Sequence, residues 1–368
     1  MEIVTAITRL LLEPMLARAG VSIGGKESCD IQVADQRFYR VVLTQGSLGL
    51  GEAYLRGWWT CNDLEELSYR LIQSGLYKAS LLLPLPLVAD LMHATFNQQS
   101  KEKSLRVAVQ HYSLGNDIFL SFLGSYHNYS CGYYLETDDL DEAQRLKLEK
   151  VCRLLDLRPG DRVLDVGGGW GEFARYAATH HGCQVTSINI ADEQIKFAKE
   201  YCKDASVEVR RCDYRDITGR FDKIMVMAML THVGYKNYRQ FMEIMARCLE
   251  PGGMMLIESV GGHKSMKNCE PWINRYIFPG GVLPSLRQID AAIAGLFSRK
   301  VLDEFGSSYV HTLRAWNRNF LQAWPAHQCR YDERVRLMFE YFFQTVAGAF
   351  RAGYLLHWHI LLQKAVSR

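Results

Sequence analysis

Between residues 141 and 260 the hydrophobic positions of the chain follow two alternating patterns. Some segments repeat apolar residues with the 3.6-residue period of an amphipathic helix, and others are short continuous apolar runs typical of buried strands. The pattern predicts helices at 141–157, 170–180, 192–203 and 237–249, and strands at 162–166, 184–190, 207–212, 223–229 and 254–260. Strands separated by helices indicate a doubly wound α/β fold with a parallel sheet.

The flanking segments have different patterns. Residues 1–95 are expected to form a small N-terminal domain, with helices over Val4–Ala19, Arg37–Gln45 and Leu64–Ser74 and a short strand near Asp30–Val33. A proline-interrupted apolar run at 81–88 is either core or a contact patch for lipid or a partner. The second domain, 96–368, starts with a helical connector. It ends with a strand near Val301 and two or three aromatic-rich helices, expected to form a lid or extension over the sheet.

A glycine cluster follows the first strand of the α/β region. The sequence DRVLDVGGGWGE places Asp165 at the strand end and then Gly167, Gly169 and Gly171. Glycines at this turn let the backbone approach a ligand closely. The spacing differs from the dinucleotide fingerprint and from the phosphate loop, and it suits S-adenosylmethionine. An ordinary glycine-rich turn is the alternative.

The other strand ends supply further candidates, because ligands of such sheets bind beyond the carboxyl ends of the strands. Asp213 with Tyr214 suits adenine recognition, although a solvated turn would have the same sequence. The remaining polar positions at strand ends are Asn189 with Gln194, Thr231 with His232, and Glu258.

Composition excludes several function classes. The 368 residues are 48% hydrophobic and 23% charged, and the net charge of +3 does not indicate a nucleic-acid partner. Ten cysteines without a C-x-x-C pair or zinc spacing indicate reduced thiols in a cytoplasmic protein with no metal site. We expect neither a secretory signal nor a membrane span, because no stretch reaches 18 apolar residues.

Eight strings, in order along the chain, carry a family resemblance: HYSLGND, YSCGYY, VLDVGGGWGE, DYRDI, HVGYKNY, NRYIFPGGVLPS, TLRAW and AGAFRAG. With GSLGLGEAY and GWW near the start, they make residues 10–360 resemble the cyclopropane fatty acid synthases. The resemblance implies a Rossmann-like class I methyltransferase sheet with helical lid insertions and a small N-terminal α+β domain. It also implies methyl transfer from S-adenosylmethionine to a cis double bond of an acyl chain, usually in a phospholipid, followed by ring closure. The protein would then lie peripherally on the inner face of the membrane and could dimerise through its N-terminal domain.

The resemblance also assigns residues to a cofactor pocket. Three positions depart from the family pattern: Gly168 replaces a cysteine, Asn189 a threonine and Glu172 a glycine. Asn189 can still offer a side-chain hydrogen bond. The matching positions are Tyr129, Ser130, Gly167, Gly169, Trp170 and Gln194.

The catalytic positions differ more. Family members hold a bicarbonate ion as general base, and this chain keeps the cysteine and tyrosine of that site as Cys131 and Tyr309. Thr231 stands where the family has glutamate, and Glu258 where it has histidine. We hypothesise that the Glu258 carboxylate is the base, with Cys131, Tyr309 and Thr231 as hydrogen-bond neighbours and His232 beside the site. Bicarbonate would then be dispensable, since two anions in one site repel each other.

Several alternatives stay open from sequence. Glu258 could pair with Lys264 or His263 in an inactive cofactor-binding homologue, or the substrate could be a carrier-bound or specialised-metabolite alkene. The product could also be methyl-branched or methylene. Arg314 and Arg351 could bind phosphate head groups or form ion pairs, and His111 and His263 are more simply structural. The aromatic residues that could stabilise a cationic centre are Tyr112, Phe119, Tyr133, Trp272, Tyr276, Phe278 and Tyr309.

Overall fold

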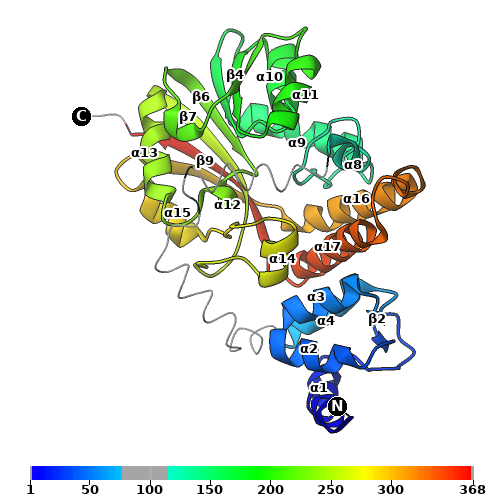
Figure 1. The fold of residues 1–368 in the computed structure, drawn as a ribbon. Helices are drawn as coiled ribbons and strands as arrows, with labels where there is room; N and C mark the ends of the chain where they lie inside the picture. Colours follow the sequence, from blue (N-terminus) through cyan, green and yellow to red (C-terminus); the bar gives the residue numbers. More distant parts are fainter. Residues whose placement is uncertain (1, 77–98, 100, 102–114, 366–368) are drawn as a thin grey trace. The chain divides into compact units, whose positions relative to one another are not determined.

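The computed structural model describes residues 2–76, 99, 101 and 115–365. It divides into two compact units (Figure 1). Unit 1 comprises Met1–Phe96, Asn268–Pro279 and Leu313–Leu355, and unit 2 comprises Asn97–Lys267, Gly280–Thr312 and Leu356–Arg368. The apolar run at 81–88, His111 and Tyr112 lie outside the described residues.

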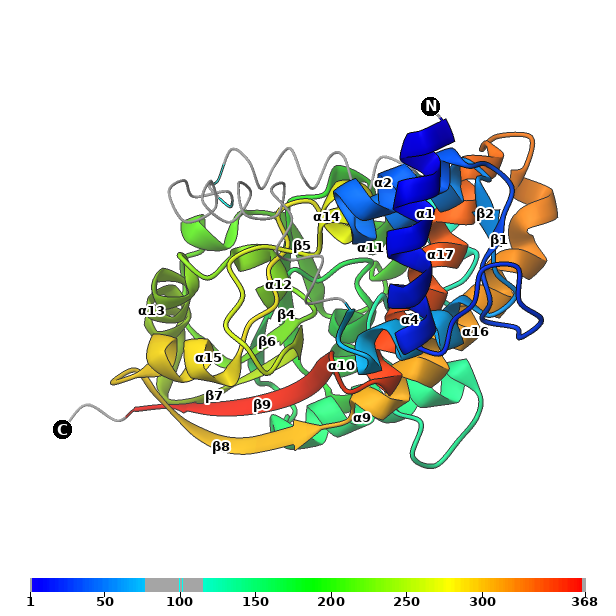
Figure 2. The ribbon, with the colours of Figure 1, turned by 90° about the horizontal axis from the view of Figure 1, so that it is seen from below.

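Unit 2 is built on a seven-stranded sheet with the strand order β5-β4-β3-β6-β7-β9-β8. The strands β3 (Arg162–Val166), β4 (Gln184–Asn189), β5 (Val207–Arg211), β6 (Phe221–Met227) and β7 (Leu249–Gly261) are parallel, as the sequence predicted. β8 (Phe297–Glu304) confirms the strand expected near Val301. β9 (Leu356–Lys364), which the sequence analysis missed, lies antiparallel between β7 and β8 (Figure 2).

Helices cover both faces of this sheet, because successive strand residues point to opposite sides. Val163 packs with α9 (Leu140–Leu154) and α10 (Glu172–His181), whereas its neighbour Leu164 packs with α13 (Tyr238–Cys248) and α15 (Leu286–Ile293). The helix α11 (Asp192–Tyr201) packs against β4 and β5. The short helices α8 (Asn116–Leu120), α12 (Leu230–Val233) and the 3₁₀ turn η1 (Tyr214–Asp216) complete the loops. The doubly wound fold is confirmed.

Unit 1 is mostly helical. It contains α1 (Glu2–Arg18), α2 (Arg37–Gln45), α3 (Ser47–Leu55), α4 (Leu64–Gln73), α14 (Pro271–Tyr276), most of α16 (Gly306–His327) and α17 (Glu333–Arg351). β1 (Gln32–Val33) and β2 (Trp59–Thr60) form a small antiparallel pair. The helix α17 packs closely on α4, since a Cβ at Gly348 would lie 2.4 Å from the Glu65 carbonyl oxygen.

This grouping differs from the sequence division at residue 95. The aromatic helix α17 and α16 from Leu313 onward, expected as a lid of the second domain, are grouped with the N-terminal residues. Three ion pairs join them: the Arg314 guanidinium donates to both oxygens of Glu65, and Arg351 donates to Glu65 and Glu66. The sequence left open whether Arg314 and Arg351 bind phosphate head groups or form ion pairs. In the structure both form ion pairs.

Candidate active site at the carboxyl edge of the sheet

The glycine turn after β3 has little room for side chains on one side and open space on the other. Gly167 and Gly169 have φ angles of 79° and 55°, which favour glycine. A Cβ at Gly168 would lie 1.9 Å from the Ser187 Oγ and 2.3 Å from an Asp165 carboxylate oxygen, whereas a Cβ at Gly169 would meet nothing within 4 Å. The turn therefore packs on the sheet through Gly168 and leaves open space at Gly169, where S-adenosylmethionine is predicted to bind.

This contrast predicts different effects of two alanine substitutions. We expect Gly168→Ala to destabilise the protein by about 1–3 kcal/mol, because the added methyl displaces the Ser187 and Asp165 side chains. Gly169→Ala should cost less stability but weaken cofactor binding, because its methyl projects into the open space. Thermal unfolding and calorimetric titration with S-adenosylmethionine separate the two effects. Equal stability losses with equal cofactor binding would contradict this assignment of the turn.

The Asp165 side chain is buried against the glycine turn. Its carboxylate is 1% exposed and accepts a 2.8 Å hydrogen bond from the Ser187 hydroxyl on β4. Burial raises the pKa of Asp165 from 3.8 to about 7, although the Ser187 hydrogen bond opposes this shift. The carboxyl group therefore titrates near neutral pH, and it contacts the glycine turn from the protein interior.

The raised pKa makes stability depend on pH. An acid with a higher pKa in the folded state binds more protons when folded, so Asp165 costs stability increasingly as the pH rises from about 4 to about 7. We expect the free energy of unfolding of Asp165→Asn, relative to that of the parent protein, to increase by about 2 kcal/mol from pH 5 to pH 8. Denaturant unfolding at both pH values measures this difference. Asp213→Asn is the matched control, since that carboxylate is ion-paired with Arg215. A stability difference independent of pH would contradict a raised pKa for Asp165.

Asn189 and Gln194 lie in the loop after β4 and bind each other. The Asn189 amide donates to the Gly169 carbonyl at 3.2 Å and to the Gln194 Oε1 at 3.0 Å, and its Oδ1 accepts the amide N–H groups of Ile190 and Ala191. Both amide hydrogens are thus used within the loop. Asn189 holds the glycine turn in place, and a hydrogen bond from it to the cofactor stays a prediction.

Asp213 and Tyr214 follow β5. The Asp213 carboxylate accepts the Arg215 backbone N–H and guanidinium at 2.9–3.0 Å. The Tyr214 ring is buried against Phe241, with centroids 5.1 Å apart, and belongs to the core between the sheet and α13. A role of this pair in adenine recognition, through the Asp213 side-chain acceptor and neighbouring backbone groups, stays a prediction.

The segment of Tyr129 and Ser130 lies beside a fully buried lysine. The Lys147 ammonium donates to the Ser130 Oγ at 2.8 Å, and Ser130 in turn donates to the Asn128 Oδ1 at 2.6 Å. Tyr129 packs against Phe119, whose ring also contacts Trp170. Trp170 is anchored by its indole N–H, which donates to the Asn116 Oδ1 at 3.0 Å. Unit 2 thus brings these three predicted cofactor residues into one aromatic and polar cluster.

Glu258 is fully buried near the carboxyl end of β7, directly beside Met227 at the end of β6. Its two carboxylate oxygens face two histidines of β9: Oε1 lies 3.3 Å from the His357 Nε2, and Oε2 lies 3.3 Å from the His359 Nε2. Burial favours a raised pKa for Glu258, but the Lys147 charge and the two imidazoles outweigh it and hold the pKa well below its usual value. Glu258 is therefore a buried carboxylate anion.

These contacts rule out one alternative and correct one expectation. The partners of Glu258 are His357 and His359, whereas His263 and Lys264 are exposed. Cys131 was expected to hydrogen-bond to Glu258. Its thiol donates instead to the Gly132 carbonyl at 3.2 Å and accepts from the Thr312 hydroxyl at 3.9 Å.

Cys131 and Tyr309 nevertheless lie within the electrostatic reach of Glu258. Burial, together with that negative charge, raises the pKa of both groups well above their usual values, so both are neutral. Tyr309 also packs edge-on against His357, with centroids 5.0 Å apart. The neutral thiol and phenol leave Glu258 as the anion of this cluster.

Thr231 and His232 lie on α12, which packs against β7. The Thr231 carbonyl accepts the Val282 N–H at 2.8 Å, so its backbone anchors the loop before α15. Burial lowers the pKa of His232 to about 4, and the imidazole is neutral at physiological pH. Contact of Thr231 with the Glu258 carboxylate stays a prediction.

The sequence analysis missed two features of the site, the buried Lys147 and the pair His357 and His359, although the sequence pattern indicates each of them. Lys147 lies on the apolar face of α9, with Leu140, Ala143, Gln144, Leu148 and Val151 at helical spacing. His357 and His359 are two apart in a strand, which places both on one face. Among the described residues, no group of three or more His, Cys, Asp or Glu side chains is arranged to hold a metal ion.

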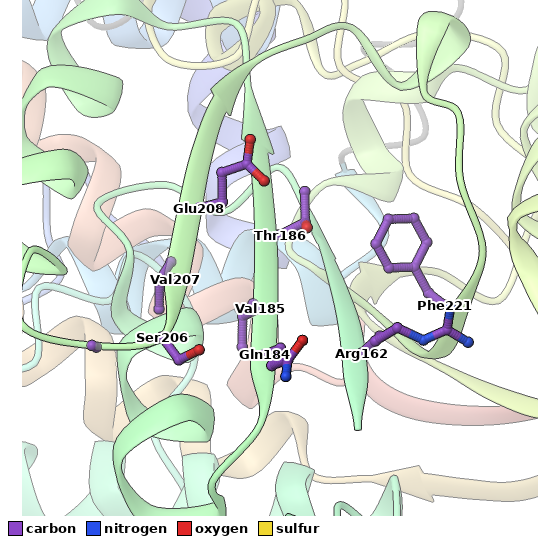
Figure 3. Close-up of a pocket in the computed structure, with 9 residues that line it drawn as sticks. Arg162, Gln184, Val185, Thr186, Ser206, Val207, Glu208 and Phe221 are labelled. Carbon is purple, nitrogen blue, oxygen red and sulfur yellow. The ribbon is translucent and has the colours of Figure 1, made fainter. Parts of the chain in front are cut away.

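A surface hollow of about 490 Å³ lies at the opposite edge of the sheet (Figure 3). It is lined by residues at or near the start of the strands, including Arg162, Gln184 and Val207. Arg162 there is held by ion pairs to Asp222 and Glu250. Because ligands of parallel sheets bind at the carboxyl edge, this hollow is separate from the candidate active site.

The sequence profile of the mycolic acid cyclopropane synthetase family matches residues 99–360. The chain belongs to this family. It is 41% identical to the cyclopropane-fatty-acyl-phospholipid synthase of Escherichia coli over 96% of this chain and 92% of that protein.

Two further family relatives come from Mycobacterium tuberculosis. The tuberculostearic acid methyltransferase UfaA1 is 29% identical over 84% of this chain and 77% of its own length. The solved structure of the cyclopropane synthase MmaA2 superposes with a TM-score of 0.67 at 23% identity, covering 71% of this chain and 98% of that chain. The family assignment and the class I methyltransferase fold inferred from sequence are confirmed, and the chain is an S-adenosylmethionine-dependent methyltransferase.

Proposed function

We propose that this protein transfers the methyl group of S-adenosylmethionine to a cis alkene of an acyl chain in a phospholipid and closes a cyclopropane ring, with Glu258 as base. The observation that carries the substrate class is the 41% identity, over nearly the whole chain, to a cyclopropane-fatty-acyl-phospholipid synthase. Bound S-adenosylmethionine supplies a methyl group on a sulfonium centre. The alkene attacks that methyl while the carbon–sulfur bond breaks and S-adenosylhomocysteine leaves, and a proton must then leave the transferred methyl before the ring closes.

The residues around Glu258 suit the removal of this proton. The carboxylate stays ionised because Lys147 and two imidazoles stabilise its charge. A carboxylate with a low pKa is a weak base, but a methyl group beside a carbocation is a strong acid, so a weak base suffices. The Glu258 Oε1 lies 3.3 Å from the His357 Nε2 without an aligned hydrogen bond, so it retains lone pairs that can accept a proton.

A second anion in this site is disfavoured. Bicarbonate beside the Glu258 carboxylate would bring like charges together in a buried site, where their repulsion is large. We therefore expect activity that does not increase when bicarbonate is added to carbonate-free buffer. A severalfold rise with bicarbonate would contradict Glu258 as the base.

Peripheral attachment to the inner face of the membrane is proposed for unit 1. The α1 side chains Ile7, Leu10 and Leu11 are 53%, 73% and 55% exposed and lie on one face at helical spacing. Such an apolar face can enter a lipid surface or a dimer contact in the N-terminal domain. Within the described residues, no helix is long and apolar enough to cross a membrane.

A methyl-branched product is the second candidate, because one relative is named a tuberculostearic acid methyltransferase. The deciding experiment incubates the protein with methyl-labelled S-adenosylmethionine and vesicles of monounsaturated phospholipid, followed by mass spectrometry of the acyl chains. A gain of one methylene with loss of the alkene supports cyclopropanation. A gain of methylene with the alkene kept, or a methyl branch, supports the second candidate. Turnover on carrier-linked alkenes alone, or cofactor binding without product, would overturn the phospholipid proposal.

A further inference from the structure

Glu258 is fully buried, so a proton that it accepts needs a route to solvent. Of its two imidazole neighbours, His357 is enclosed by the rings of Phe305 and Tyr309. His359 is also fully buried, but its second ring nitrogen, Nδ1, lies 3.9 Å from an oxygen of Asp303 on the edge strand β8. The Asp303 side chain is 34% exposed and pairs with Lys150 at 2.5 Å.

These groups form a continuous line across three neighbouring strands. The register pairs Glu258 of β7 with His359 of β9, and His359 with Asp303 of β8. Because directly paired residues in a sheet point to the same face, the three side chains follow one another from the buried site to the sheet edge. The first contact is 3.3 Å, and the second, at 3.9 Å, is a distance that one water molecule or a small side-chain movement closes.

We propose that His359 and Asp303 relay the proton from Glu258 to solvent after each turnover, an inference that rests on Glu258 being the base. The C–H bond of the new methyl breaks, its electron pair closes the ring, and the proton passes to the Glu258 carboxylate. In the resting site the His359 Nε2–H donates to the Glu258 carboxylate and Nδ1 is unprotonated. Once Glu258 holds the proton, the imidazole ring rotates, its unprotonated nitrogen takes the proton from Glu258, and its N–H, now turned toward β8, passes a proton to Asp303 and on to water. The ring is left with one proton on the nitrogen that faces Glu258, as at the start.

The state of His359 suits this role. Burial lowers the pKa of His359, although Glu258 opposes the shift, so the ring is neutral and carries one proton at physiological pH. A neutral imidazole has one donor and one acceptor nitrogen, as a two-sided relay requires. His359 acts through Glu258 and has no contact with substrate in this scheme.

The test is the time course of the first few turnovers. A broken relay leaves the proton on Glu258, so one product per active site forms quickly and later turnovers slow. We expect His359→Gln and Asp303→Asn to show this burst in rapid-quench experiments with labelled S-adenosylmethionine and lipid vesicles. Steady-state turnover should fall about tenfold, and the effect of D₂O on the steady-state rate should increase. His357→Gln is the matched control, because it contacts the same carboxylate at the same 3.3 Å but does not face Asp303, and it should give no burst.

The outcomes separate this proposal from the one on which it rests. If Glu258→Gln makes no product in the first turnover while His359→Gln and Asp303→Asn match the wild-type steady state, the base stands and the relay is wrong. If Glu258→Gln turns over normally, both are wrong. If His359→Gln does not fold, Asp303→Asn still tests the relay, because Asp303 is partly exposed on the edge strand β8 and its substitution should not prevent folding. Equal slowing of its first and later turnovers would also overturn the relay.

Discussion

Glu258→Gln should lower kcat by about 10²- to 10⁴-fold, the contribution typical of a positioned general base. Glutamine keeps the size of the side chain and can still accept a hydrogen bond from His359, but its amide cannot take a proton from the new methyl. The affinity for S-adenosylmethionine should change little, because the contacts of Glu258 are His357 and His359, neither of which is a predicted cofactor residue. The measurement is steady-state methyl transfer to monounsaturated phospholipid, with cofactor affinity from calorimetry.

A matched control is Glu149→Gln on α9. That carboxylate is also paired with a histidine, His181 at 3.3 Å, but it is partly exposed and lies outside the Glu258 cluster. It should keep wild-type kcat. Substantial activity of Glu258→Gln, within a few-fold of the parent, would show that another group removes the proton.

Lys147→Met should destabilise the protein by about 3–5 kcal/mol, because removal of one member of a buried charged cluster leaves the other charge uncompensated. Lys147 is fully buried, and its charge is the largest favourable influence on the ionised form of Glu258. Methionine fills a similar volume, so the loss reports charge rather than packing. Denaturant unfolding at pH 7.5 measures the change in the free energy of unfolding.

The double variant Lys147→Met/Glu258→Gln decides whether the two charges act on each other. If they do, removing both should recover at least about 1 kcal/mol of the summed single losses, since coupled sites are not additive. Additive losses would mean that Lys147 stabilises the fold through Ser130 and Met227, which it contacts at 2.8 and 3.3 Å, and not through Glu258.

The pattern of apolar residues was sufficient for the central α/β layers. The strand β3 was predicted with its observed bounds, and β4, β5, α11 and α13 were predicted within about two residues of theirs. Burial of a strand or of one helix face requires apolar residues at a fixed spacing, and that spacing is visible in the sequence. β9 was missed because LHWHILLQK mixes apolar residues with histidines and follows a helix without a clear break. Its antiparallel insertion between β7 and β8 depends on pairing partners far away in the chain.

The sequence alone determined the family, the glycine turn for S-adenosylmethionine and the exchange that places a carboxylate at residue 258, because these depend on residue identity at strand ends. Only the tertiary structure decided what surrounds that carboxylate. His357 and His359 lie about one hundred positions beyond Glu258 and reach it through the register of β7 and β9, and Lys147 reaches the cluster from α9. The charge of a buried group depends on which dipoles and ions the fold brings within a few ångströms, and spacing along the chain does not contain that information.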